Sequence, residues 1–241
     1  MVFVYGIIFR IQGYNATILA YGQTGTGKTY TMEGASYHIQ DQNRGIVPRS
    51  VAEIFKYIEG QSNLSTAFEV RAAYLQIYNE MVSDLINAEG KSLQIREHQK
   101  KGVFVEGLSE WIVKSPEEVY SLIQRGAAVR ATASTKMNEF SSRSHAVFML
   151  VVEQVLYEGD QKEEETKRVR VSKLNLVDLA GSERVRVTGA TGKRLEECKK
   201  INQSLSALGN VIAVLTESTK PRLHVPYRNS KVIFGFVKNF T

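Results

Sequence analysis

The sequence contains very little cysteine and proline. One cysteine, Cys198, stands among the 241 residues, which excludes an internal disulfide and a metal site built from several cysteines. A single thiol is compatible with a reducing, intracellular compartment. Four prolines are spread along the chain, with no internal repeat or low-complexity tract. The apolar segment Met1–Phe9 lacks a basic leader and a small-residue cleavage site and is too short to span a bilayer, so we expect buried structure there and no membrane insertion.

The overall balance of residue types is that of a globular protein. Hydrophobic residues make up 43% of the chain and charged residues 23%, which is enough apolar material for a sizeable core. The length fits either one large domain or two small ones. The net charge of +6 suits an acidic partner, and nucleic acid, an anionic membrane and an acidic protein filament all remain open, as does a basic surface with no partner.

The segment from Gly22 to Thr29 reads Gly-Gln-Thr-Gly-Thr-Gly-Lys-Thr, which is the pattern of a phosphate-binding loop. Its glycines let the backbone turn tightly and approach phosphate oxygens without a side chain in the way. Lys28 has the position that places a positive charge on the β- and γ-phosphates, and the Thr29 hydroxyl has the position of a Mg²⁺ ligand. A β-favouring run precedes the loop and a helix-like run follows it, so the sequence predicts a nucleoside triphosphate site.

Apolar, β-favouring runs alternate with helical patterns along the chain. We expect strands at Thr17–Tyr21, Phe68–Tyr78, Ala146–Gln154 and Val169–Asp178, short strands within Leu93–Val113 with a hairpin tip at Lys100–Gly102, and helices from Val47, over Glu80–Ile86, from Pro116 after the capping box that Ser115 begins, and over Leu195–Leu215. The last helix should bury a stripe formed by Leu195, Cys198, Ile201, Leu205, Leu208 and Ile212. No linker divides the chain, so we predict one α/β domain over residues 1–241 with a mixed sheet.

Two further segments carry chemistry once a phosphate loop is present. Asp178 ends an apolar strand, where phosphate-loop proteins hold magnesium, and Gly181 just beyond it offers an unobstructed backbone N–H to a γ-phosphate. The second segment, Asn138–His145, places clustered hydroxyls before the strand at Ala146, where they suit Mg²⁺, phosphate oxygens and an attacking water. Within that segment we expect His145 to be structural, because it stands at the start of a strand.

Taken together and in this order, the three motifs resemble the motor domain of a kinesin. The resemblance extends to two later blocks and covers roughly Gly13 to Lys231. The matching segments are Tyr21–Met32, Ser141–His145, Asp178–Arg184, Ile201–Ile212 and His224–Lys231. The resemblance implies an α/β P-loop NTPase fold in which helices flank a mixed central sheet. It also implies a cytoplasmic, microtubule-associated protein, with no nucleic acid as partner.

The resemblance further implies ATP and Mg²⁺ as ligands. The positions that it assigns to the ATP phosphates, and at the end of the segment to the neighbourhood of the adenine, are Gly22, Gln23, Thr24, Gly25, Thr26, Gly27, Lys28, Thr29 and Tyr30. Thr29 and Ser142 would flank the Mg²⁺ ion, and Asp178 would lie behind them. The expected metal site is therefore shared between the phosphate loop and the two later motifs.

Four residues receive catalytic roles from the same resemblance. Ser141 and the amide of Gly181 would face the γ-phosphate and the attacking water. Arg143 and Glu183 match an ion pair that closes the two switch loops, and Glu183 would help to relay the proton of the water. These roles agree with phosphoryl transfer as a reaction of positioning and charge stabilisation.

A microtubule-binding face is implied as well, because in kinesins the long helix after the second switch and the loop beyond it rest on the microtubule. The basic residues at these positions, or at a second contact, are Lys100, Lys101, Lys193, Arg194, Lys199, Lys200, Arg222, His224 and Arg228. The surface of tubulin is acidic, so such contacts should be sensitive to salt. A shift of the helix Leu195–Leu215 when Gly181 gains or loses the γ-phosphate would link ATP to the filament.

Both ends of the sequence depart from the kinesin pattern. The family has a further strand, an Arg-x-Arg-Pro base-binding segment and a full helix before the turn that here begins at Gly13. After Lys231 the family continues with a threonine-containing helix, a last strand and helix, and a neck, whereas this sequence ends with Val232–Thr241. We therefore expect an open edge and an uncovered face at the phosphate-loop strand, with Met1–Phe9 and Val232–Phe240 as the candidate segments to cover them. Directional motility of this chain alone is not expected.

Two functions stay open on the sequence. The first is a microtubule-stimulated ATPase of kinesin type, which hydrolyses ATP to ADP and phosphate. The second is a non-motile module that binds ATP or microtubules but turns over poorly because terminal segments are missing. A GTPase or another phosphate-loop ATPase is disfavoured, because no Asn-Lys-x-Asp base-reading sequence is present and the segments Ser141–His145 and Asp178–Arg184 match kinesins.

Overall fold

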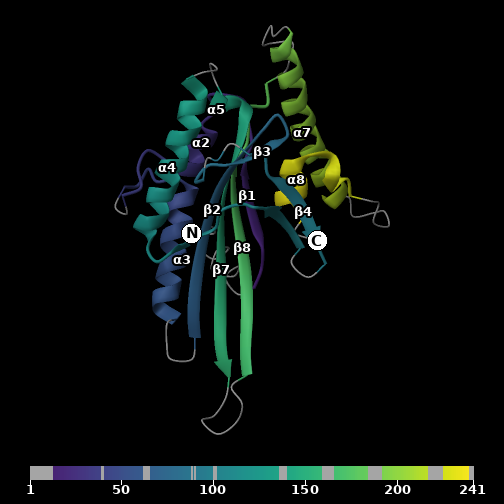
Figure 1. The fold of residues 1–241 in the computed structure, drawn as a ribbon. Helices are drawn as coiled ribbons and strands as arrows, with labels where there is room; N and C mark the ends of the chain where they lie inside the picture. Colours follow the sequence, from purple (N-terminus) through teal and green to yellow (C-terminus); the bar gives the residue numbers. More distant parts are fainter. Residues whose placement is uncertain are drawn as a thin grey trace.

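Groups of strands and groups of helices follow one another along the chain, as Figure 1 shows for the computed structural model. The structure describes residues 13–38, 41–61, 66–87, 89, 91–99, 102–135, 140–158, 166–183, 192–216 and 225–238. The strands are β1 (Ala16–Ala20), β2 (Thr66–Tyr78), β3 (Met81–Asp84), β4 (Gln94–His98), β5 (Gly102–Glu106), β6 (Trp111–Val113), β7 (Ser144–Glu158) and β8 (Thr166–Asp178). The helices are α2 (Lys28–Glu33), α3 (Ile46–Gln61), α4 (Pro116–Thr135), α5 (Phe140–Arg143), α7 (Lys193–Thr216), the 3-10 turn η1 (Tyr227–Asn229) and α8 (Lys231–Phe236).

Among the described residues, six strands form one mixed sheet in the order β1-β8-β7-β2-β3, with β6 paired to β2. The pair β1–β8 is parallel, and the pairs β8–β7, β7–β2, β2–β3 and β2–β6 are antiparallel. Strands β4 and β5 form a separate hairpin. The predicted α/β class with a mixed central sheet is confirmed, and the strands expected from apolar runs are present and longer than expected on β7 and β8.

The register of the strands brings the predicted motifs to the same end of the sheet. Ala20, the last residue of β1, lies opposite Asp178, the last residue of β8. Asp178 lies opposite Ala146 on β7, which begins only two residues earlier at Ser144. The phosphate loop that follows β1, the segment that follows β8 and the segment that precedes β7 therefore meet at the same end of the sheet, as expected for ligand sites at strand ends of open α/β sheets.

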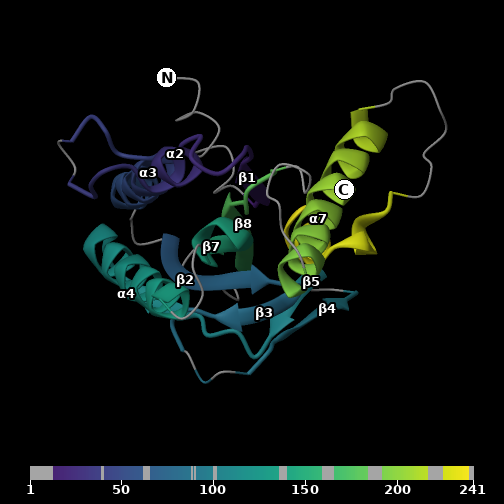
Figure 2. The same cartoon turned by 90° about the horizontal axis from the view of Figure 1, so that it is seen from above.

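Helices cover both faces of the sheet, as the view from above shows (Figure 2). Successive residues of β2 and β7 point to opposite faces, so Tyr74 and Phe148 join one core with helices α2, α3 and α4, while Leu75 and Val147 join a second core with α7 and α8. Burial on both faces explains why these strands read as near-continuous apolar runs. No helix in the described ranges is both long enough and apolar enough to cross a membrane.

The capping box predicted before α4 is formed in part, because the Glu118 carboxylate bonds to the N–H of Lys114 and not to that of Ser115. The N–H of Glu118 donates to the Ser115 hydroxyl (3.3 Å), and the Glu118 carboxylate in turn accepts from the N–H of Lys114 (2.8 Å). These bonds satisfy backbone donors at the start of the helix, and Pro116 at its first position has no N–H to satisfy. Helix α3 likewise has its expected apolar face, with Val51 and Ile54 buried.

The short helix predicted over Glu80–Ile86 is wrong, because the segment contains strand β3 instead. Asn79 and Glu80 both adopt a positive φ, 53° and 60°, which is the backbone of a tight two-residue hairpin turn. Tyr78 therefore pairs directly with Met81, and β3 runs back along β2. Asn-Glu is not the usual Asn-Gly signal of such a turn, so the hairpin is not evident from the local sequence.

Helix α7 confirms the predicted long helix but corrects its buried stripe. Ile201, Leu205 and Leu208 are buried as expected, whereas Ile212 is 48% exposed and its neighbour Val211 is fully buried. Positions three and four residues after Leu208 flank the same stripe, so the sequence period does not decide between them and packing selects Val211. Cys198 is half-buried on this helix, partly as expected for a small apolar residue.

The phosphate-loop strand lies at the end of the described strand order, paired with β8 alone. Its face, however, is covered in part by α8, which buries Val232, Ile233 and Phe236. The Thr17 hydroxyl on β1 donates to the carbonyl of Phe236 (2.5 Å). Of the two segments expected to cover this strand, 232–236 does so as a helix, and Met1–Phe9 lies outside the described residues.

Candidate nucleotide-binding site

The predicted phosphate loop connects β1 to α2 and has the backbone that its glycines permit. Gly25 and Gly27 adopt φ values of 80° and 88°, in the left-handed region that side chains disfavour. The N–H and the hydroxyl of Thr26 both donate to the carbonyl of Gln23 (3.3 and 2.8 Å), which closes the loop into a tight turn. Lys28 lies over this turn, with its ammonium 2.9 Å from the same carbonyl. The loop thus brings its backbone N–H groups and the ammonium of Lys28 close together around one tight turn.

A buried carboxylate lies directly behind the loop. Asp178 is 6% exposed, and its Oδ2 accepts the Thr29 hydroxyl at 2.6 Å. Its second oxygen, Oδ1, is buried with no hydrogen-bond partner among the described residues. Hydroxyl and carboxylate oxygens are the ligands that Mg²⁺ prefers, and a buried carboxylate oxygen without a partner is a group that a cation or its water would satisfy. Thr29 and Asp178 therefore fit a magnesium ion.

Arg130 on α4 also belongs to this site, and the sequence interpretation missed it. Its side chain is buried, with Nη1 3.7 Å from Asp178 Oδ2 and Nη2 donating to the carbonyl of Ser144 at 2.9 Å. The signal was present in the sequence, because Arg130 continues the apolar stripe of Val119 and Ile123. A charged residue on a buried helix stripe indicates a buried partner of opposite charge.

The three predicted motifs are joined by backbone hydrogen bonds. After Asp178, the N–H of Leu179 donates to Ala20 (3.3 Å), that of Gly181 to Ser142 (2.7 Å) and that of Ser182 to Gly22 (3.1 Å). The segment that follows β8 therefore lies between the phosphate loop and the segment that precedes β7. The predicted juxtaposition of Gly181 with the phosphate loop and with the serine-rich motif is what the structure shows.

The expected ion pair between Arg143 and Glu183 is not formed. Arg143 pairs instead with Glu197 on α7, at 3.4 Å, in a half-buried position. Glu183 folds toward the phosphate loop, where its carboxylate accepts from both the N–H (3.2 Å) and the hydroxyl of Thr24. Two donors on one residue hold the carboxylate there, and the nearer Glu197 satisfies the guanidinium.

The remaining predicted residues are placed unevenly. Tyr30 is 56% exposed on α2. Ser141 lies on α5, and its side chain is outside the described set. Of the predicted basic residues, Lys199 pairs with Glu196 (2.7 Å), Lys200 is exposed on α7 and Arg228 is exposed beside Glu97 (3.4 Å). Residues Lys100, Lys101, Arg222 and His224, and the side chains of Lys193 and Arg194, lie outside the described parts of the chain.

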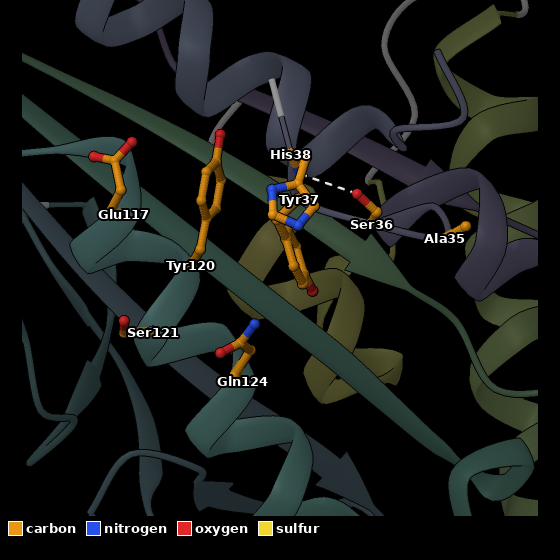
Figure 3. Close-up of a pocket in the computed structure, with 8 residues that line it drawn as sticks. All are labelled: Ala35, Ser36, Tyr37, His38, Glu117, Tyr120, Ser121 and Gln124. Carbon is orange, nitrogen blue, oxygen red and sulfur yellow. Dashed lines mark hydrogen bonds between the residues drawn. The ribbon is translucent and has the colours of Figure 1, made fainter. Parts of the chain in front are cut away.

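A separate hollow of about 830 Å³ opens between the segment after α2 and the helix α4 (Figure 3). In this view Glu117, Tyr120 and Gln124 project from α4 on one side, and residues 35–38 form the other. The rings of Tyr37 and Tyr120 stack with their centroids 5.2 Å apart. The Tyr37 hydroxyl donates to Glu33 (3.3 Å), and burial raises the pKa of that carboxyl while the charge of Arg130 opposes the rise. Glu33 thus lies between this hollow and the Asp178–Arg130 pair.

The glycine-rich loop between β1 and α2, together with the buried carboxylate at the end of the adjacent parallel strand, defines a P-loop nucleotide-binding protein. The sequence model of the kinesin motor domain matches residues 7–235, and the chain belongs to this family. The resemblance inferred from the sequence motifs is thereby confirmed.

Known relatives cover most of the chain. It is 47% identical to the kinesin-like protein KIN-7N of Arabidopsis thaliana over 222 residues, which are 92% of this chain and 26% of the relative. Identity to the kinesin heavy chain of Neurospora crassa is also 47%, over 92% of this chain and 23% of the relative. The solved structure of a fast kinesin superposes with a TM-score of 0.83 at 43% identity, over 98% of this chain and 63% of that one. The chain spans about a quarter of the length of these curated relatives.

Proposed function

We propose that residues 1–241 form a single kinesin-type motor domain that hydrolyses ATP to ADP and phosphate and is stimulated by microtubules. The observation that carries the proposal is the hydrogen bond from the Gly181 amide to the Ser142 carbonyl (2.7 Å). This bond joins the segment after β8 to the segment before β7 beside the phosphate loop, and we infer that these two segments are the switches. A γ-phosphate oxygen is charged and hence a stronger acceptor than a carbonyl, so bound ATP would take over the amide and move Gly181 relative to Ser142.

The proposed chemistry follows from the groups around the loop. Lys28 exchanges its bond to the Gln23 carbonyl for phosphate oxygens and neutralises charge that develops as the terminal phosphoryl group leaves. The oxygen of a water bonds to the γ-phosphorus, and the bond from that phosphorus to the β–γ bridging oxygen breaks. Ser141 and the Gly181 amide orient this water, and Glu183, which is held beside the loop by Thr24, accepts its proton through the hydrogen-bonded network.

Mg²⁺ would be held by the hydroxyls of Thr29 and Ser142, with Asp178 behind them. When bound, the ion supplies neutralisation of the phosphate charge. The residues of this chain do the rest. Asp178 keeps the Thr29 hydroxyl oriented at 2.6 Å, and Arg130, 3.7 Å from the same carboxylate oxygen, keeps Asp178 in place.

The proposal is tested by ATP turnover of the purified chain with and without microtubules, combined with co-sedimentation at two salt concentrations. Turnover that rises at least tenfold with microtubules supports a motor-type ATPase. Salt-sensitive pelleting without stimulated turnover supports the alternative, a binding module that turns over poorly. If microtubules neither stimulate turnover nor pull the chain into the pellet, the proposed filament partner is contradicted.

Glu97 on β4 provides a test of the filament face. Its carboxylate accepts from Lys238 (2.5 Å) and pairs with Arg228 (3.4 Å), and the bond from Lys238 holds the pKa of Glu97 below its usual range. The carboxylate therefore neutralises Arg228, which we assign to the surface that binds the acidic filament. Replacing Glu97 with glutamine is expected to tighten microtubule binding at low salt by about two- to fivefold, as measured by co-sedimentation.

The matched control is Glu106→Gln on the partner strand β5. Glu106 pairs with Arg96 (2.6 Å) and lies opposite Gln94, whereas Glu97 lies opposite Val103, so the two carboxylates stand on opposite faces of the hairpin. Both variants change the net charge equally, and only Glu97→Gln should alter binding appreciably. Equal tightening in the two variants would mean that overall charge, and not this face, controls the contact.

A further inference from the structure

His145 is a buried side chain that the proposed chemistry does not use. It is 4% exposed at the start of β7, and both nitrogens of its ring have partners. Nδ1 accepts the backbone N–H of Ala180 at 3.0 Å, and Nε2 lies 3.2 Å from the hydroxyl of Ser204, which is 4% exposed on α7. One imidazole therefore contacts the residue before Gly181 on one side and the long helix on the other.

The donors and acceptors of this contact have a single consistent direction. The N–H of Ala180 must donate, so Nδ1 carries the lone pair and Nε2 carries the hydrogen. Nε2 then donates to Ser204, whose hydroxyl hydrogen points to the carbonyl of Ile201 at 2.7 Å. Burial, with a smaller contribution from Arg130, lowers the pKa of His145 to about 4, so the ring is neutral near neutral pH and can keep this arrangement.

The segment Ser142–His145 accepts hydrogen bonds from two successive backbone amides of the loop after Asp178, those of Ala180 and Gly181. The Gly181 N–H is held by the carbonyl of Ser142, and the Ala180 N–H by the ring of His145, three residues further on. The side chain of His145 continues to Ser204 on α7, next to the separate ion pair that Arg143 forms with Glu197 on the same helix. A planar ring packed in the core transmits displacement with little loss, because it has no free rotation between its two nitrogens.

We propose that His145 is a positioning residue that couples the Gly181 loop to helix α7 through Ser204. The inference rests on the proposed function, since it assigns the route by which a change at the γ-phosphate would reach the helix expected to contact the microtubule. When the Gly181 amide turns toward a phosphate, Ala180 moves with it. The imidazole of His145 moves with Ala180 through the hydrogen bond to Nδ1, and the bond from Nε2 to Ser204 displaces α7. Conversely, a filament that fixes α7 would fix the loop, because coupling between two sites is reciprocal.

The experiment compares Ser204→Ala with Ser204→Thr and with the matched control Ser50→Ala. Ser50 is also a buried helical serine that donates to a carbonyl of its own helix, Ile46 at 2.8 Å, but it lies on α3. For each protein, basal turnover, microtubule-stimulated turnover and the melting temperature are measured. The ratio of stimulated to basal turnover is expected to fall about tenfold in Ser204→Ala, to recover in Ser204→Thr and to hold in Ser50→Ala.

Similar losses of melting temperature in the two alanine variants would show that general destabilisation does not account for the difference. A second readout is hydrogen exchange of the α7 amides, compared between a non-hydrolysable ATP analogue and ADP. This difference should be present in the wild type and absent in Ser204→Ala. In a His145→Phe background, Ser204→Ala should have no further effect on the ratio, because the link is already broken.

The outcomes separate the two proposals. A wild-type chain without stimulation overturns the proposed function, and this inference with it. Stimulation that is normal in the wild type and equally normal in Ser204→Ala overturns the inference alone. A ratio that falls equally in Ser204→Ala and Ser50→Ala also overturns it, because the effect would then follow from lost core hydrogen bonds.

Discussion

Replacing Gly181 with alanine is expected to lower microtubule-stimulated ATP turnover by about 100- to 1,000-fold while ATP still binds. A Cβ at this position would overlap the carboxylate oxygens of Glu183 and the hydroxyl of Thr24. Those two side chains are hydrogen-bonded to each other, so the methyl group must push Glu183 away from the phosphate loop and displace the amide assigned to the γ-phosphate. The three atoms nearest the new Cβ belong to Glu183 and Thr24, so Lys28 and Thr29 should continue to bind nucleotide.

The measurement is steady-state turnover at saturating microtubules, beside the dissociation constant of a fluorescent ATP analogue. Gly209→Ala is the matched control, because Gly209 lies within α7 and an added Cβ there would meet no atom within 4 Å. That substitution should leave turnover within about twofold and slightly stabilise the helix. Retained stimulation in Gly181→Ala would refute the assigned role, and loss of ATP affinity would show that the clash spreads into the phosphate loop.

The parts of the site that the sequence predicted are those determined by local chain geometry. Gly25 and Gly27 adopt the positive φ values that a phosphate loop requires, and a strand and a helix flank them as expected. The position of Asp178 was predictable too, because an apolar run that ends in a carboxylate places it at a strand end. The sequence likewise predicted the long strands, because strands that are buried on both faces contain near-continuous apolar runs.

The parts that it did not predict depend on which distant groups meet. The partner of Arg143 is Glu197 and not Glu183, a choice decided by where α7 lies. Strand β3 follows from the left-handed pair at Asn79 and Glu80 and from pairing with β2, which override the helical pattern of the residues. Arg130 was passed over because a single charge within a helical pattern is usually exposed, and only the fold places it beside Asp178.

Replacing Arg130 with methionine is expected to reduce the free energy of unfolding by about 3–5 kcal/mol at pH 7. The side chains of Arg130 and Asp178 are both almost fully buried, so the substitution leaves a carboxylate in the core whose one remaining partner, among the residues that the structure describes, is the Thr29 hydroxyl. Glu33 contributes in the same direction, because burial already raises the pKa of its carboxyl and the charge of Arg130 limits that rise. Without the arginine, the pKa of Glu33 should rise further in the folded state.

The sign of the pH dependence distinguishes this electrostatic account from a packing defect. A carboxyl whose folded pKa is raised contributes stability that is fully present below its unfolded pKa and is lost as the pH rises through the folded pKa. The raised pKa of Glu33, raised further in Arg130→Met, therefore makes the variant's deficit largest at pH 7 and smaller toward about pH 5. Denaturant unfolding at both pH values measures the deficit.

Arg125→Met supplies the control for that series. Arg125 is an exposed residue of the same helix, and its guanidinium lies 5.7 Å from the ring centre of Trp111. Losing this contact should cost about 0.5–1 kcal/mol, equally at both pH values, because no buried acid depends on it. A deficit in Arg130→Met that is as small as in the control, or that stays constant with pH, would mean that Asp178 and Glu33 do not need the cation. In that case Arg130 would act through packing alone, and the proposed support of the Asp178 carboxylate by Arg130 would fail.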